Sequence, residues 1–162
     1  MIKLVFFILL LFTLNFHRAV EPMAVTVLVN GRRAENNLPE LKVSPLLTQV
    51  AQMKAEDMAR KGYFAHISPE GVTPWYWFNK VGYRYAYAGE NLAVSFTDSE
   101  EVTEAWMNSA SHKANIVGRY YEEIGTGVAT GTLNGKVTTF VVQVYAKPKA
   151  SNLSLIPTLL GG

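Results

Sequence analysis

The sequence predicts an α+β domain in which helices pack on a small antiparallel sheet. Two observations lead to this prediction: segments with helical start and stop signals lie before residue 111, and a strong β-hairpin signal lies after residue 118. The 162 residues are enough for one domain with a hydrophobic core, and a charged share of 17% is that of a globular protein rather than a disordered one.

The charge balance argues against nucleic acid as a partner. The formal net charge is +2, and it falls to zero when Lys3 and Arg18 are set aside, because 13 basic residues then face 13 acidic ones. Nucleic-acid binding needs a strongly basic surface, which this composition does not supply. The sequence has no cysteine, so an exported form must be stable without disulfides, and we expect it to be a monomer.

The N-terminal segment is typical of an export signal. The apolar run LVFFILLLFTLNF follows Lys3 and is shorter than the ~20 residues that a membrane-spanning helix needs. We therefore predict that residues 1–20 form a signal peptide or a signal anchor, and that the protein is secreted or extracytoplasmic, at the cell envelope. Cleavage near Ala19 or Ala24, retention as an uncleaved anchor, and a buried core helix remain the alternatives.

Residues 22–38 fit two structures equally well. The stretch AVTVLV is rich in the β-branched residues of a strand, whereas Val25, Leu28 and Val29 have the spacing of a helix face, and Pro22 is suited to a helix start. Local signals alone leave this segment undecided.

The segment 44–62 predicts a helix with both ends marked. Ser44 is a candidate N-cap, Pro45 suits the first helical position, and Gly62 is a candidate terminator. Between them runs a helical stripe of apolar residues: Leu47, Ala51, Ala55 and Met58.

Two shorter helices are predicted further along the chain. Residues 73–82 carry Thr73-Pro74 at the start and Gly82 at the end, and they belong to a segment dense in aromatic residues that we expect to form core. Residues 97–110 combine Thr97 with Glu100 as a capping box, ahead of an apolar face that includes Trp106.

After residue 118 the pattern changes to strands. Residues 124–132 and 137–146 flank Asn134-Gly135, the dipeptide typical of a two-residue type I′ hairpin, and residues 139–144 alternate in polarity. We predict an antiparallel pair here. Residues 148–162 show no sustained period and are predicted to form a flexible C-terminal tail.

Two candidate functional residues lie in loops or near strand starts. His66 follows a helix in YFAHISPEG, among turn-forming residues, where functional side chains are common, although a histidine there can also simply brace the turn. Glu90 in AGENLAV has apolar neighbours, so an ionised carboxylate there needs a donor or a cation; a buried structural acid is the alternative.

His112 is the third candidate. It lies near the start of a short predicted helix with Ser109 or Ser111 as N-cap, where the helix dipole favours the neutral imidazole that can accept a proton or bind a metal. A Ser-His-acid hydrolase is also conceivable, but the sequence has no G-x-S-x-G elbow for the nucleophile.

Five motifs in order resemble the CAP superfamily of cysteine-rich secretory proteins, antigen 5 and pathogenesis-related protein 1, also called the SCP domain. The motifs are YFAHISPEG, AGENLAV, WMNSASHKANI, IGTGVA and VVQVYA. The chain looks like the short, cysteine-free bacterial branch, and the resemblance spans residues 24–147. It implies a three-layer α-β-α sandwich with a central antiparallel sheet, with a helix in the undecided segment.

The resemblance also implies a shared cleft. His66, Glu90 and His112 match two histidines and one acid of the family's cavity, whereas the second acid, expected three residues after Trp106, is replaced by Ser109. No cofactor is certain; a divalent metal such as zinc at His66 and His112 is the candidate. We expect a non-enzymatic module for an unknown small-molecule, lipid or protein ligand, with a metal-dependent or Ser/His hydrolase at the cell envelope as the alternative.

Overall fold

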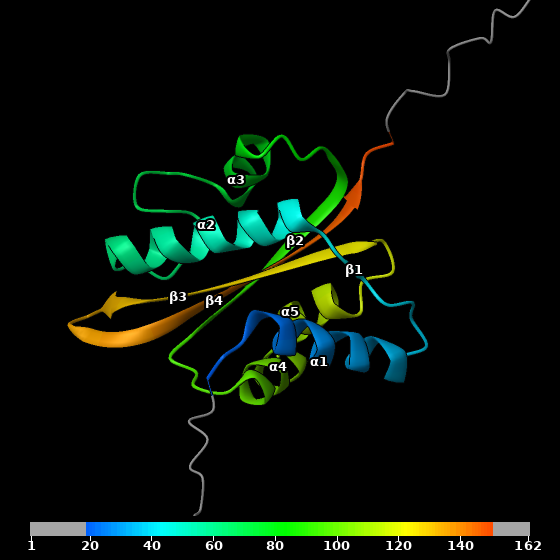
Figure 1. The fold of residues 1–162 in the computed structure, drawn as a ribbon, viewed down its shortest axis with the longest axis horizontal. Helices are drawn as coiled ribbons and strands as arrows, with labels where there is room; N and C mark the ends of the chain where they lie inside the picture. The colour runs from blue at the N-terminus through cyan, green and yellow to red at the C-terminus, as the bar shows by residue number, and fades with distance from the viewer. Residues whose placement is uncertain (1–18, 151–162) are drawn as a thin grey trace, which may run out of the picture.

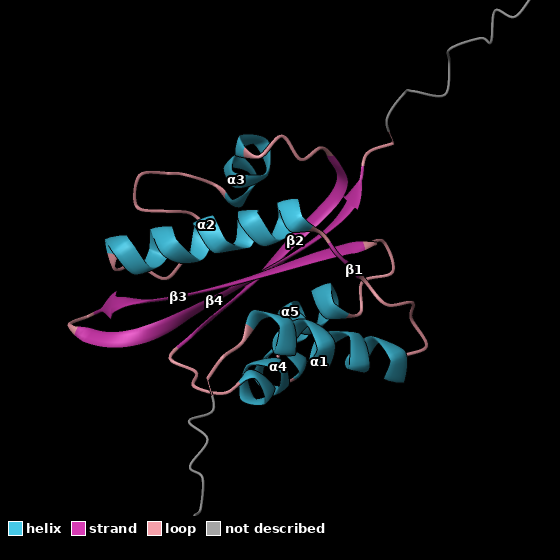
Figure 2. Cartoon of the chain, in the orientation of Figure 1, coloured by secondary structure: helices cyan, strands magenta, loops and turns pink. Residues whose placement is uncertain are grey.

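The computed structural model describes residues 19–150 as a three-layer α-β-α sandwich (Figures 1 and 2). Most of the predicted leader (1–20) and tail (148–162) lies outside the described residues. The elements in chain order are α1 (Pro22–Glu35), β1 (Lys42–Val43), α2 (Pro45–Lys61), α3 (Pro74–Lys80), β2 (Tyr85–Val94), α4 (Ser99–Met107), α5 (Ala110–Ile116), β3 (Glu123–Leu133) and β4 (Lys136–Pro148).

The central sheet is built around the predicted hairpin. Strand order is β1-β3-β4-β2, with β4 antiparallel to both β3 and β2, while the two-residue β1 adds in parallel to β3. Leu133 pairs with Lys136 across Asn134 and Gly135, whose φ values of 51° and 78° are the positive angles of a type I′ turn. The antiparallel core of the sheet is therefore confirmed, and β2 is left as an edge strand.

Helices cover both faces of the sheet. In Figure 1, α2 and α3 lie on one side and α1, α4 and α5 on the other. Each side has its own buried core, with Leu47, Met58 and Phe78 in the first and Val25, Trp106 and Ile124 in the second. Among residues 19–150, none of the helices is both long and apolar enough to cross a membrane.

The undecided segment at residues 22–38 contains helix α1. Pro22 occupies its first turn, and the face with Val25 and Val29 is fully buried against the second core. The segment is helical despite its local strand propensity because this face is buried, and helices gain most of their stability from packing an amphipathic face.

Helix α2 is as predicted, and it lies unusually close to β3. Ser44 is its N-cap residue, and Gly62 ends it with a φ of 67°. A Cβ added at Gly125, Gly127 or Gly131 of β3 would lie between 2.1 and 2.4 Å from backbone atoms of α2, such as those of Leu47. Only glycine lets the helix backbone rest on the strand here.

Two local expectations need correction. The N-cap of α4 is Asp98 and not Thr97: the Asp98 carboxylate accepts hydrogen bonds from the backbone N–H groups of Glu100 and Glu101. Aspartate is the stronger cap because its charge also favours the helix N-terminus. The aromatic segment, residues 75–87, is only partly core, since Trp77 and Phe78 are buried whereas three of its members are exposed: Trp75, Tyr76 and Tyr87.

Candidate functional site

His66 stands on a loop that a buried lysine holds in place. The loop follows α2, and the Lys54 ammonium beneath it donates hydrogen bonds to the carbonyl oxygens of Ala65 (2.9 Å) and His66 (3.0 Å) and to the Tyr63 hydroxyl (3.1 Å). Lys54 is fully buried, whereas the His66 side chain is 55% exposed. The backbone of the loop is thus fixed from below while its imidazole faces outward.

Glu90 of β2 orients the His66 ring. Its Oε1 lies 2.6 Å from His66 Nδ1, and the carboxylate is buried, with a side-chain exposure of only 3%. An ionised carboxylate can only accept, so it selects the tautomer with the proton on Nδ1 and leaves the Nε2 lone pair free. Burial lowers the pKa of Lys54, and the negative charge of Glu90 opposes that shift.

His112 of α5 completes the predicted trio. Its side chain is half-buried, and burial lowers the pKa of the imidazole, with a smaller contribution in the same direction from His66. His112 is neutral near neutral pH and has a ring nitrogen able to accept a hydrogen bond.

Two asparagines tie the strand that carries Glu90 to the helix that carries His112. Asn115 Nδ2 donates to the Glu90 carbonyl (3.2 Å) and to Asn91 Oδ1 (2.8 Å), and Asn91 Nδ2 donates to the His112 carbonyl (3.1 Å). The Asn91 amide also reaches the buried Tyr145 hydroxyl at 3.3 Å. The site is therefore held by a satisfied polar network and not by isolated contacts.

An apolar groove adjoins His112. It has a volume of about 280 Å³, and its lining includes Phe64, Leu92, Phe96 and Trp106. The Trp106 indole N–H donates to the Leu92 carbonyl (3.0 Å), which covers the edge of β2 at this point. The polar side chains of the lining are Ser109 and His112.

Ser109 lies in the groove, but its contacts do not form a catalytic triad. Its hydroxyl is 3.3 Å from that of Ser111. Within residues 19–150, no hydrogen bond joins either serine to His112. A serine nucleophile needs such a contact with its base, so this geometry does not favour the hydrolase alternative.

The side chains of His66, Glu90 and His112 also do not form a metal centre. Across the described part of the chain, no group of three or more histidine, aspartate and glutamate side chains is placed to hold an ion. Glu90 is engaged with His66 Nδ1, which leaves the two imidazoles as the possible ligands.

Some site residues were missed by the sequence analysis. Lys54 lies on the apolar stripe of α2, three residues after Ala51, and a lysine on a buried helix face was the signal that could have revealed it. Asn91 and Asn115 gave no such signal, because their partners come from other elements.

The fold and the site together define a class: a three-layer α-β-α domain with a His66–Glu90 pair on its edge strand and an apolar groove beside His112. The chain belongs to the cysteine-rich secretory protein (CAP) family, whose family model matches residues 27–145. This match and the structural neighbours confirm the family and the fold that the five motifs indicated.

Individual relatives support the same assignment. The chain is 37% identical over 110 residues to YkwD of Bacillus subtilis (strain 168). The aligned region covers 67% of this chain and 43% of YkwD. An extracellular protein containing an SCP domain from Bacillus anthracis has a TM-score of 0.68 at 25% identity, covering 78% of this chain and 40% of that one. An outer surface protein from Borrelia burgdorferi has a TM-score of 0.67 at 24% identity, covering 78% of this chain and 92% of that one. The chain thus spans less than half of the YkwD sequence.

Proposed function

We propose that this domain is an exported, non-enzymatic module that binds a ligand or partner at the cleft of His66, Glu90 and His112. The contact of 2.6 Å between His66 Nδ1 and Glu90 Oε1 carries the proposal. It couples a buried carboxylate to an outward-facing imidazole, so the ring is held in one orientation and one tautomer before any ligand arrives.

The cleft offers hydrogen bonding next to an apolar surface. Nε2 of His66 and the neutral ring of His112 supply the polar contacts, and the groove over Trp106 accepts an apolar group. A few oriented polar groups beside an apolar lining are typical of small-molecule sites. This arrangement suits a small molecule, a lipid or a protein side chain that carries both kinds of group.

Divalent metal binding at this cleft is proposed to be weak. The two imidazoles are the available ligands, with Glu90 as the carboxylate that orients His66 from behind. Sites with at least three protein ligands hold zinc much more firmly. Zinc is therefore a useful probe of the paired imidazoles, and no step of the proposed binding depends on it.

An extracytoplasmic location is part of the proposal. The Bacillus anthracis neighbour is described as extracellular and the Borrelia burgdorferi neighbour as an outer surface protein. The leader-like residues 1–20 and the absence of cysteine in the sequence are compatible with export.

Zinc titration by calorimetry tests the paired imidazoles. We expect weak binding that fades as the solution is acidified, because protons compete with zinc for the imidazole nitrogens. His66→Ala and His112→Ala should each abolish it, and the double variant should lose no more, because both rings belong to one site. Ser109→Glu should strengthen binding by adding a carboxylate beside His112.

Ser111→Ala is the matched control, since Ser111 is exposed on the same helix as His112 and should leave zinc binding unchanged. Zinc binding that survives both alanine substitutions would show that the two rings do not share a site.

A further inference from the structure

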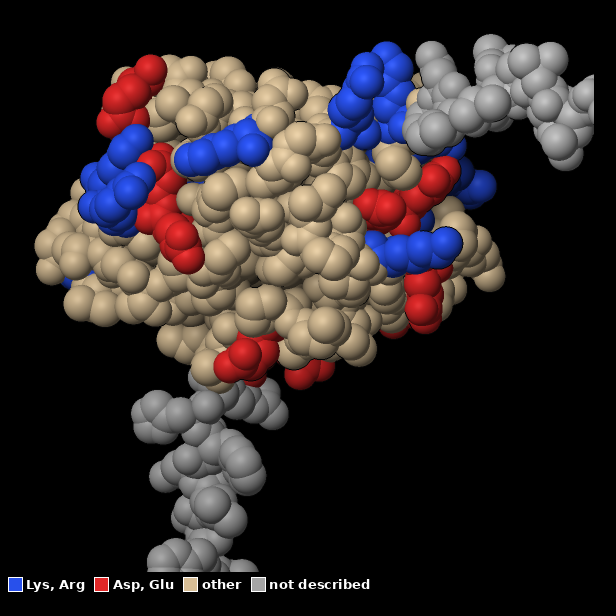
Figure 3. Space-filling model, turned by 45° about the horizontal axis from the view of Figure 1, so that its top comes forward, with Lys and Arg blue, Asp and Glu red and all other residues tan. Residues whose placement is uncertain are grey.

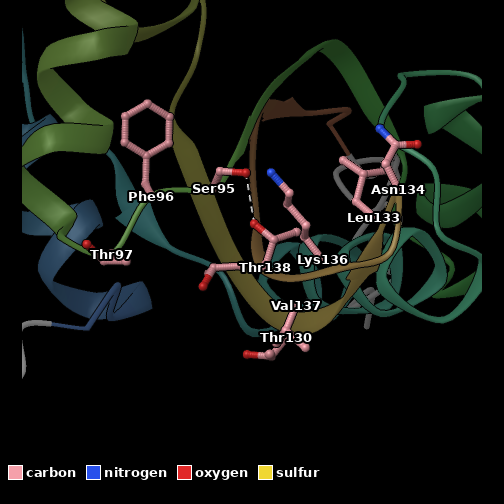
Figure 4. Close-up of a pocket in the computed structure, with 10 residues that line it drawn as sticks. Ser95, Phe96, Thr97, Thr130, Leu133, Asn134, Lys136, Val137 and Thr138 are labelled. Atoms are coloured by element: carbon pink, nitrogen blue, oxygen red, sulfur yellow. Dashed lines mark hydrogen bonds between the residues drawn. The ribbon is translucent and has the colours of Figure 1, made fainter.

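A second cavity lies between the tip of the β3-β4 hairpin and the loop that joins β2 to α4 (Figure 4), and it shares Phe96 with the groove beside His112. Its volume is about 490 Å³, within the ~300–1,000 Å³ usual for ligand sites. Ser95 and Thr97 come from the loop, and Thr130, Lys136 and Thr138 come from the hairpin. The proposed function assigns no role to this cavity.

Hydroxyl groups dominate the polar lining. Ser95, Thr97, Thr130 and Thr138 each carry one, and a hydroxyl both donates and accepts, as do the hydroxyls of a sugar ring. Leu133 and the exposed Val137 supply an apolar patch for the C–H face of a sugar. Among the described residues, the lining includes no acidic side chain, and the Lys136 ammonium is its cation. One lysine suits a single carboxylate better than the several charges of a polyphosphate.

Two of the hydroxyls are held side by side. Ser95 Oγ and Thr138 Oγ1 are 2.9 Å apart, and the Ser95 backbone N–H donates to the Thr139 carbonyl at 3.0 Å (Figure 4). Ser95 has a φ of 68°, an angle that is uncommon for a residue other than glycine. Such strain concentrates at ligand sites. The fixed hydroxyl pair matches the adjacent hydroxyls of a sugar.

We propose that this cavity is a saccharide-binding site, with Lys136 giving it a preference for a sugar that carries a carboxylate. The cavity shares Phe96 with the groove beside His112, but its lining includes none of His66, Glu90 and His112, so either proposal can fail without the other.

The test is a titration of the isotope-labelled full chain by NMR, with tetragalacturonate, its methyl ester and chitotetraose as probes. The saccharides should shift the backbone amides of residues 95–97 and 133–139. Tetragalacturonate should bind at least about fivefold more tightly than its neutral ester, because the ester removes the charge that Lys136 attracts. Lys136→Gln should remove that difference and leave the binding of the ester unchanged.

Thr138→Val should weaken binding of all probes at least about fivefold, because valine keeps the shape of threonine but leaves a ligand hydroxyl unpaired. Thr132→Val, on the same hairpin but outside the cavity, should bind like the unchanged chain. The proposal is overturned if none of the three saccharides shifts these amides at millimolar concentration, if the shifts centre on His66 and His112, or if Thr132→Val loses binding as Thr138→Val does.

Discussion

Lys54 lies on the buried face of α2, yet its ammonium has a full set of partners. It donates to the Tyr63 hydroxyl and to the carbonyls of Ala65 and His66, and the Tyr63 hydroxyl donates in turn to Asp57 at 2.7 Å. A buried cation is tolerated when its donors are satisfied and acidic groups lie near. Lys54 therefore acts as the internal support of the His66 loop.

Replacing Lys54 with methionine should destabilise the domain by about 2–3 kcal/mol, because the volume is kept while buried carbonyls lose their donor. The His66 loop should also become mobile, which hydrogen exchange of residues 63–68 would detect. Lys61→Met is the comparison, since the Lys61 ammonium is partly exposed and its ion pairs with Asp57 and Glu70 should contribute much less to stability. Equal losses in the two variants would contradict a special role for Lys54.

His112 should make stability depend on pH. Burial holds the pKa of the folded imidazole below that of the unfolded chain, about 6.5, so the unfolded state binds its proton first as the pH falls. The free energy of unfolding should therefore fall from about pH 6.5 downward until the pH passes the lowered folded pKa. Urea unfolding across this range should give a flatter profile for His112→Gln.

Ser111→Ala should keep the profile of the unchanged chain, because it alters the same helix without removing a titrating group. If His112→Gln shows the full acid dependence, the stability change comes from other groups.

At the scale of elements, the start and stop signals in the sequence were sufficient to predict those helices and turns whose structure depends on neighbouring residues alone. Helix α2 begins after Ser44, at Pro45, and ends before Gly62. The predicted two-residue turn forms at Asn134-Gly135. Helix α1 could not be predicted from propensity, because its structure depends on burying Val25 and Val29 against elements far along the chain. The contact of α2 with the glycines of β3 is equally non-local.

Gly127→Ala should therefore be strongly destabilising. Its Cβ would lie 2.3 Å from the Gln52 backbone nitrogen of α2, and a helix backbone cannot rotate away as a side chain can. We expect a loss of about 3 kcal/mol, at the upper end of overpacking effects, measured by chemical denaturation. Gly31→Ala is the control: a Cβ there meets nothing within 4 Å, and alanine should stabilise α1 by about 0.5–1 kcal/mol. A neutral Gly127→Ala would mean that α2 can shift away from β3.

At the scale of the molecule, charge is distributed without a dominant patch on the face drawn in Figure 3: basic and acidic side chains adjoin at both ends, and a few acidic side chains lie along the lower edge. This agrees with the low net charge of the sequence.

The candidate site shows what a linear sequence conveys at this scale. His66, Glu90 and His112 were identified through the family motifs, but their proximity depends on the loop, the edge strand and α5 meeting in the fold. The asparagine network was not predictable, since Asn91 bonds to Tyr145, 54 residues away.

The folded domain includes residues that precede helix α1. Val20 is buried at 7% exposure in the core between α1 and the sheet, and the Glu21 backbone N–H donates to the Ser99 hydroxyl at 2.9 Å. Of the two cleavage positions considered, release at Ala19 keeps these contacts, whereas release at Ala24 removes them together with Pro22 and the first turn of α1.

A chain that begins at Ala24 should therefore be less stable than one that begins at Ala19 by about 2–4 kcal/mol, from the lost burial of one valine and one hydrogen bond. Urea unfolding of the two chains measures the difference. Val20→Ala in the longer chain separates the side chain from the loss of the first turn and should cost about half as much, since alanine keeps part of the burial. Equal midpoints for the two chains would show that residues 19–23 do not belong to the folded unit.

If the difference in stability is found, we expect mass spectrometry of the exported protein to give a mature N-terminus at or before Val20, because cleavage at Ala24 would release a weakened domain.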